Sequence, residues 1–177
     1  MPKHHCKSKC KCVCFFEPPI IPPFPPVSNT NLERLLAIYQ AFQNGDPTPF
    51  LNALAPNFVL TYHGDSARVG PVPIIPFAGS FVGVAGVQQY LQKLTQSLIT
   101  ISQSSPSNIQ ANSDFTQITI NVTDVVQPRC GTVLGPVLTL KSVIQTGFNA
   151  QGQIISTDIY EDTSALAIFY NSNCPPL

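Results

Sequence analysis

Apolar residues recur at every third or fourth position over residues 30–43, and this spacing predicts an amphipathic helix. Thr30 and Glu33 have the spacing of a capping box at its start, and Gly45 follows its end. A second, short helix is expected over residues 47–54, after Asp46. The same helical spacing returns over residues 83–98 and predicts a third helix.

Strand patterns occupy most of the remaining sequence. The segment "NFVLTYH" (57–63) alternates, with Tyr62 on the same face as its apolar residues. From residue 108 onward, strand-like segments separated by the turns "PRCG" and "NAQGQ" predict an antiparallel meander. A short helix over "DTSALAIFY" closes the pattern. Helices followed by a run of strands are typical of an α+β domain rather than of alternating βαβ units.

The first 29 residues differ from the rest in composition. Six prolines between positions 18 and 26 fix φ and remove backbone donors, so we expect an extended, poorly ordered arm there. We divide the chain into this Cys-rich and Pro-rich arm (1–29), one domain (30–172) and a C-terminal tail (173–177).

Charge excludes some classes of partner. Nine basic and nine acidic residues give a formal net charge of zero, without the basic face that nucleic acid requires. We find no secretory signal and no apolar stretch of membrane-spanning length, so we expect no membrane partner and a cytoplasmic location. Packaging in a spore coat or a similar assembled shell is the alternative. No cofactor is expected.

Three segments carry a resemblance to a known family. "NFVLTYHG", "IPFAGSFVGVAGVQQYL" and "FNAQGQIISTDIYEDTSALA" occur in family order, and residues 30–170 resemble the SnoaL-like, ketosteroid-isomerase-related branch of the NTF2-like superfamily. The resemblance implies an NTF2-like cone, in which a curved antiparallel sheet wraps round three N-terminal helices. It also implies a homodimer and a cavity for a hydrophobic small molecule. It does not imply one activity, since one fold serves many functions.

A pocket carboxylate is the group that proton abstraction would need. Asp124 continues the inward parity of Ile118, Ile120 and Val122, so it should point into the cone, where burial would raise its pKa. We take Asp124 as the candidate general base. The alternative is a solvated carboxylate at the end of a hairpin.

Other polar residues complete the candidate pocket. Tyr62 could offer its hydroxyl to a ligand or belong to the core with its tip at the rim. Tyr160 and Asp162 match the family pattern, and Asp162 is also a candidate helix N-cap. His63 has the opposite parity to Tyr62, so it should face solvent or a dimer partner.

The cysteines form two groups. Cys6, Cys10, Cys12 and Cys14 lie beside His4 and His5 in the arm, a spacing that suits crosslinks to neighbouring proteins, a thiophilic metal, or no function in a reduced tail. We prefer crosslinking to metal binding. Cys130 and Cys174 are taken as free thiols, because cytosolic cysteines stay reduced.

The sequence therefore predicts a small-molecule-binding pocket domain, without established catalysis, that is tethered or crosslinked through its arm. An isomerase- or cyclase-type enzyme with a pocket carboxylate as general base is one alternative. A metal-binding arm on a structural domain is the other.

Overall fold

The computed structural model describes residues 30–64 and 75–174 of the chain. The predicted arm with its four cysteines lies outside the described residues. Within them, no helix has the length and apolar character needed to span a membrane.

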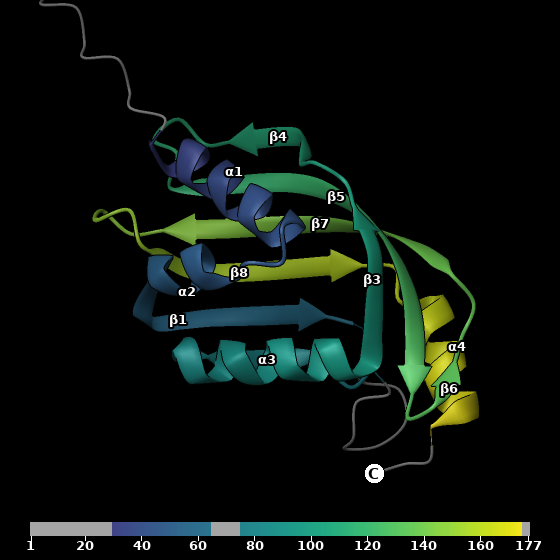
Figure 1. Ribbon diagram of the computed structural model, residues 1–177. Helices are drawn as coiled ribbons and strands as arrows, with labels where there is room; N and C mark the ends of the chain where they lie inside the picture. Colours follow the sequence, from purple (N-terminus) through teal and green to yellow (C-terminus); the bar gives the residue numbers. More distant parts are fainter. Residues whose placement is uncertain (1–29, 65–74, 175–177) are drawn as a thin grey trace, which may run out of the picture.

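The described residues form a mixed α+β fold (Figure 1). The helices are α1 (Thr30–Gln43), α2 (Thr48–Ala53), α3 (Gly83–Ser97) and α4 (Ser164–Asn173). The strands are β1 (Leu54–His63), β2 (Gly79–Val82), β3 (Leu98–Gln103), β4 (Ser107–Ala111), β5 (Gln117–Cys130), β6 (Val133–Leu134), β7 (Leu138–Phe148) and β8 (Ile154–Glu161).

One strongly curved sheet organises the molecule. Its strand order is β2-β1-β8-β7-β5-β3, and β4 and β6 also pair with β5. The predicted antiparallel meander is confirmed for β5, β7 and β8, whereas β1 joins β8 in parallel. Figure 1 shows the long strand β5 curving so that β4 lies along one part of it and β3 along another. The sheet therefore has a concave inner face and a convex outer face.

The core fills the concave face. Ile118, Ile120 and Val122 of β5 are at most 1% exposed, because alternate residues of a strand point to the same side. Leu35 of α1 and Val87 of α3 are buried in the same cluster. Helices α1 and α2 lie over this face in Figure 1, and α4 lies at one end of the sheet.

Three strands were not predicted, namely β2, β3 and the two-residue strand β6. β2 lies within the "AGSFVG" segment, and β3 follows α3 directly, since Leu98 already has extended backbone angles. In β3 only Leu98 is buried. A strand with one buried residue has little of the alternating pattern from which strands are recognised.

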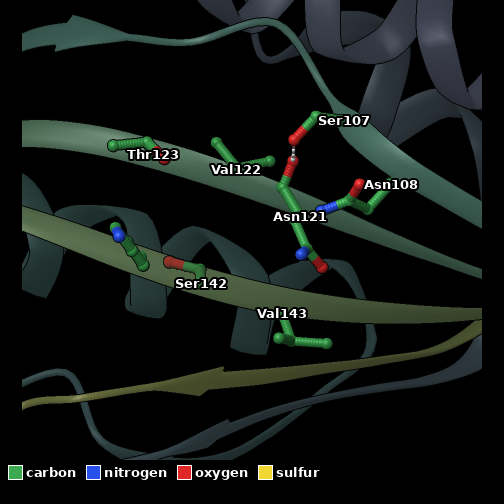
Figure 2. Close-up of a pocket in the computed structure, with 8 residues that line it drawn as sticks. Ser107, Asn108, Asn121, Val122, Thr123, Ser142 and Val143 are labelled. Atoms are coloured by element: carbon green, nitrogen blue, oxygen red, sulfur yellow. Dashed lines mark hydrogen bonds between the residues drawn. The ribbon is translucent and has the colours of Figure 1, made fainter.

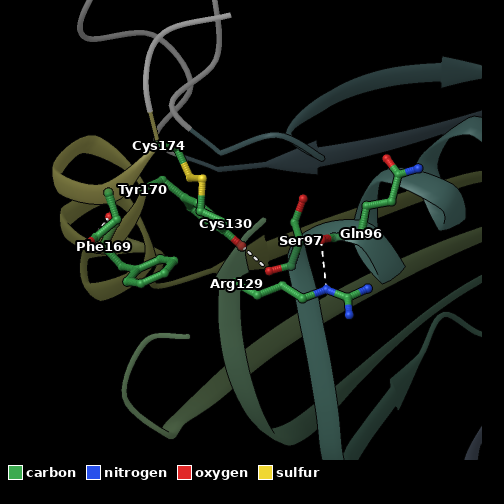
Figure 3. The surroundings of a disulfide bond; sticks show 8 residues. Gln96, Ser97, Arg129, Cys130, Phe169, Tyr170 and Cys174 are labelled. Carbon is green, nitrogen blue, oxygen red and sulfur yellow. Dashed lines mark hydrogen bonds between the residues drawn. A yellow bond between two sulfur atoms is a disulfide. The ribbon is translucent and has the colours of Figure 1, made fainter. Parts of the chain in front are cut away.

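The prediction that Cys130 and Cys174 are free thiols was wrong. They form a disulfide with a Cα–Cα distance of 5.7 Å, which ties the end of β5 to the residue after α4 (Figure 3). Beside it the Tyr170 hydroxyl donates a hydrogen bond to the Ser97 carbonyl oxygen at 2.6 Å, and Arg129 Nε donates to the Gln96 carbonyl oxygen at 2.9 Å. Tertiary packing brings these cysteines together across a separation of 44 residues.

Candidate functional site

Two carboxyl groups lie on the concave side of the sheet. Asp124 follows the buried residues of β5, as its parity predicted, and Glu161 continues the inward parity of Ile159 on β8. Strand β7 lies between them and pairs Leu140 with Asp124 and Ser142 with Glu161. Two strand spacings, roughly 10 Å, therefore separate the two backbones, and the curvature turns both side chains toward the same interior.

Glu161 is held by two hydroxyl groups. The Tyr62 hydroxyl donates a hydrogen bond to Oε2, and the Ser142 hydroxyl donates one to Oε1 at 2.8 Å. Burial raises the pKa of Glu161, and these two hydrogen bonds act in the opposite direction. Both carboxylate oxygens are thus engaged, so Glu161 fixes Tyr62 rather than standing free for a ligand.

Asp124 is less completely satisfied. Burial, and then the charge of Glu161, raise its pKa to about 6, against a hydrogen bond from the Gln103 side chain that lowers it. Its buried oxygen Oδ1 has no hydrogen-bond partner among the described residues. Leaving a buried acceptor without a hydrogen bond costs free energy. Asp124 avoids this cost either by accepting a hydrogen bond from a ligand hydroxyl or by taking up a proton.

Three phenols surround the acids. Tyr62 and Tyr90 have ring centroids 6.3 Å apart and are 4% and 7% exposed, and Tyr39 of α1 is partly buried. Burial raises the pKa of all three phenols, and the charge of Asp124 raises each of them further. All three therefore stay protonated near neutral pH and can act as donors. For Tyr90 no hydrogen bond of the hydroxyl is present among the described residues.

Aromatic side chains line the same region. Phe77 packs edge-on against Tyr62 at 5.0 Å, and Phe81 lies 5.4 Å from Tyr90. The arrangement combines apolar walls with a few polar groups, which is typical of small-molecule sites.

The other predicted pocket residues do not join this group. Tyr160 is 44% exposed on the outer face and stacks on His63 with centroids 4.3 Å apart, so its prediction as a pocket residue was wrong. His63 is exposed, as its parity predicted, and its Nε2 atom lies 3.0 Å from Oδ1 of Asp158. The register pairs His63 with Tyr160 and Tyr62 with Ile159, so Tyr160 must face the side opposite to Tyr62.

Asp162 also lies on the surface and has a structural role. Its carboxylate accepts hydrogen bonds from the backbone nitrogen of Ser164 at 3.1 Å and from the Ser164 hydroxyl at 2.8 Å. The N-cap position of α4 is Thr163, so Asp162 is the residue before the N-cap and not the N-cap that was predicted. It still accepts hydrogen bonds from the first turn of α4. These bonds lower its pKa.

Sequence reasoning missed Glu161. A signal was available, since Glu161 lies two residues after Ile159 and shares its parity. The alternation of β8 is interrupted, however, because the register shifts between Gly147 and Phe148 of its partner strand. The sequence pattern therefore could not show which face of β8 is concave.

Two surface hollows lie away from the acids. One lies around Lys141 and the other around Arg34, each with a volume of about 310 Å³, and neither is lined by Asp124 or Glu161. Neither hollow contains a carboxyl group. We place the candidate site at Asp124 and Glu161 because acid–base chemistry needs such groups in a desolvated setting.

Among the residues that the structure describes, no group of three or more His, Cys, Asp or Glu side chains converges in a way that could hold an ion.

The fold matches that of known proteins. An NTF2-like protein from Burkholderia pseudomallei K96243 is 21% identical, with a TM-score of 0.62 over 78% of this chain and 95% of that one. TerC, solved with polyporic acid, is 17% identical, with a TM-score of 0.60 over 80% and 98%. A proposed polyketide cyclase from Pseudomonas putida KT2440 is 16% identical, with a TM-score of 0.59 over 78% and 96%.

These similarities define the class by fold. The described domain has the NTF2-like fold, which it shares with solved structures that include a proposed SnoaL-like polyketide cyclase. No family model and no curated protein matches the sequence.

Proposed function

We propose that the concave face binds a small unsaturated carbonyl compound and catalyses proton transfer on it, with Asp124 as the general base. The observation that carries this proposal is the Asp124 carboxyl, which has a buried unpaired oxygen and a pKa of about 6, and whose charge acts on the phenols of Tyr39, Tyr62 and Tyr90. A base with a pKa near the working pH combines a high ionised fraction with useful proton affinity. The structural neighbours named for polyporic acid and for polyketide cyclisation support a small-molecule pocket.

The residues divide the chemistry between them. Asp124 takes a proton from the carbon next to the carbonyl group, and the electron pair of that C–H bond moves to the carbonyl oxygen. Tyr90, whose hydroxyl has no described partner, donates a hydrogen bond to the developing oxyanion. The Tyr62–Glu161 pair is a fixed polar wall that orients the ligand. Returning the proton from Asp124 to another carbon of the same molecule completes an isomerisation.

Hydrogen–deuterium exchange tests the proton transfer without the natural substrate. In D₂O, wild-type protein should accelerate exchange at the α-carbons of cyclohexanone and cyclic β,γ-enones, measured by ¹H NMR. Asp124→Asn should lose about 100-fold or more of that rate, the usual contribution of a positioned base. Asp158→Asn removes an acid from the outer face and is the matched control, expected at the wild-type rate. Equal rates in the wild type and Asp124→Asn refute catalysis by this residue.

Binding without catalysis gives a different result. A binding protein would show ligand-induced NMR shifts at Tyr62 and Tyr90 with no exchange above background. Native mass spectrometry of protein purified from its source would reveal a retained ligand, and would also test the predicted homodimer.

We also propose that the N-terminal arm crosslinks the protein to its neighbours. Its four cysteines lie within nine positions, so pairing all of them with one another would form small, strained loops. The Cys130–Cys174 disulfide adds support, because disulfides persist in oxidising surroundings.

Electrophoresis of native material with and without reductant tests the crosslinking. Multimers that dissociate with reductant, and that are absent when Cys6, Cys10, Cys12 and Cys14 are changed to Ser, are the expected result. A pattern unaffected by reductant, with one bound Cu or Zn per arm, would assign the arm to metal binding instead.

A further inference from the structure

A polar hollow lies on the face of the sheet opposite to the acids. It has a volume of about 310 Å³ and is lined by Ser107 and Asn108 of β4, Asn121, Val122 and Thr123 of β5, and Lys141, Ser142 and Val143 of β7. Figure 2 shows the side chains of Ser107, Asn108 and Asn121 gathered where β4 meets β5. The side chains of Val122 and Ser142 are buried, at 1% and 4% exposure, so these two residues contribute mainly backbone to its floor.

An irregularity of β4 accompanies the hollow. The β4–β5 register shifts between Ser107 and Gln110. Asn108 lies within this interval and has a positive φ of 47°, a conformation that few residues other than glycine adopt. Asparagine is one of the residues that tolerate it, and such conformations are frequent at ligand-binding sites. The shift interrupts the regular pairing of β4 with β5 beside Asn121.

The lining combines neutral hydrogen-bonding groups with one cation. Asn108 and Asn121 supply amides, each with donors and an acceptor, and Thr123 supplies a hydroxyl. Ser107 donates a hydrogen bond to the Asn121 carbonyl oxygen at 3.3 Å, which leaves its own oxygen free to accept. Lys141 has no carboxylate partner in the described part of the chain, where the one ion pair is His63–Asp158.

We propose that this hollow binds a hydroxylated carboxylate of the sugar-acid type. The Lys141 ammonium group pairs with the ligand carboxylate, and the amides and hydroxyls of Asn108, Asn121 and Thr123 bond to the ligand hydroxyls. A neutral sugar would leave Lys141 unused. A phosphate would be poorly matched, since the lining offers one cation and no helix N-terminus. The volume lies at the lower end of the range for ligand sites and so suits a single ring.

This site is independent of the acids on the concave face. Its ligand is either a free sugar acid or the terminal residue of an acidic polysaccharide, which share the same carboxylate and hydroxyl groups. If the ligand is a free sugar acid, the monomer must bind. If it is the end of a polysaccharide, a short oligomer must bind more tightly than the monomer.

NMR titration of the ¹⁵N-labelled full chain tests the proposal with galacturonate, trigalacturonate and glucose. We expect galacturonate to shift the side-chain amides of Asn108 and Asn121, and glucose to bind at least tenfold more weakly. Lys141→Gln should weaken galacturonate binding about tenfold, which is the scale of a charge-assisted hydrogen bond. Lys93→Gln removes the same charge from α3 and is the matched control, with wild-type affinity expected.

A second variant guards against an indirect effect of Lys141. Asn121→Asp keeps the shape of the side chain but places a negative charge in the hollow, and it should abolish galacturonate binding while Asp124→Asn leaves it unchanged. Tighter binding of trigalacturonate would identify a polysaccharide end as the ligand, and equal binding would identify the free acid. No shifts with any probe, equal binding of glucose, or the same affinity in Lys141→Gln and Lys93→Gln would overturn the proposal.

Discussion

Replacing Asp124 with Asn should stabilise the protein near neutral pH. The ordinary pKa of this carboxyl group is 3.8, and in the folded protein it is about 6 because burial disfavours the charged form. Below pH 3.8 the group is protonated in both states and folding incurs no penalty. As pH rises from 3.8 through 6, the folded state must either keep the proton or bury the charge, so stability is lost across that range and remains lower above it.

The magnitude follows from the two pKa values. A difference of about 2 pH units corresponds to about 3 kcal/mol, and solvent screening of this partly exposed group reduces that to about 1–2 kcal/mol. Asp124→Asn removes the ionisable group, so its melting temperature at pH 7.5 should exceed that of the wild type by about 3–6 °C. The gain should shrink toward zero as pH falls below 4.

Differential scanning calorimetry at pH 7.5 and pH 3.5 measures this effect. Asp162→Asn is the control with the opposite sign, because hydrogen bonds from Ser164 lower the pKa of Asp162 and its ionised form stabilises the fold. That variant should melt lower than the wild type at pH 7.5, and the difference should narrow at pH 3.5, because the stabilisation is lost only as pH falls through the lowered pKa of Asp162. If Asp124→Asn melts at or below the wild-type temperature at pH 7.5, the assignment of Asp124 as a destabilised carboxylate is refuted.

Two further stability predictions concern α4. Reducing the Cys130–Cys174 disulfide releases a loop of 44 residues, which costs about 4 kcal/mol in the chain-entropy account, so the melting temperature should fall by about 10 °C. The Cys130→Ser variant should melt at that lower temperature with or without reductant. If reductant does not change the melting temperature of the wild type, the disulfide is not present. Leu166→Ala truncates a side chain of 0% exposure and should cost about 2–5 kcal/mol in urea unfolding at an unchanged m-value. Ile168→Ala, at 70% exposure on the same helix, should cost far less.

The sequence by itself determined much of the local structure and the fold class. The apolar spacing of α3 and the alternation of β5 are properties of neighbouring residues, and they predicted both elements within a few positions. The same alternation predicted that Asp124 points inward, because a strand carries its side chains to each face in turn. Its catalytic role stays a prediction.

Only the tertiary structure decided which groups lie on the concave face together with Asp124. Glu161 and Tyr62 are 99 residues apart, and their contact depends on the parallel pairing of β1 with β8. Alternation divides β8 into two faces but does not say which face becomes concave, so Tyr160 was predicted inside and Glu161 was missed. The Cys130–Cys174 bond depends likewise on the docking of α4 against β5. Local patterns encode which residues share a face, whereas register and curvature, set by contacts between distant segments, determine what that face encloses.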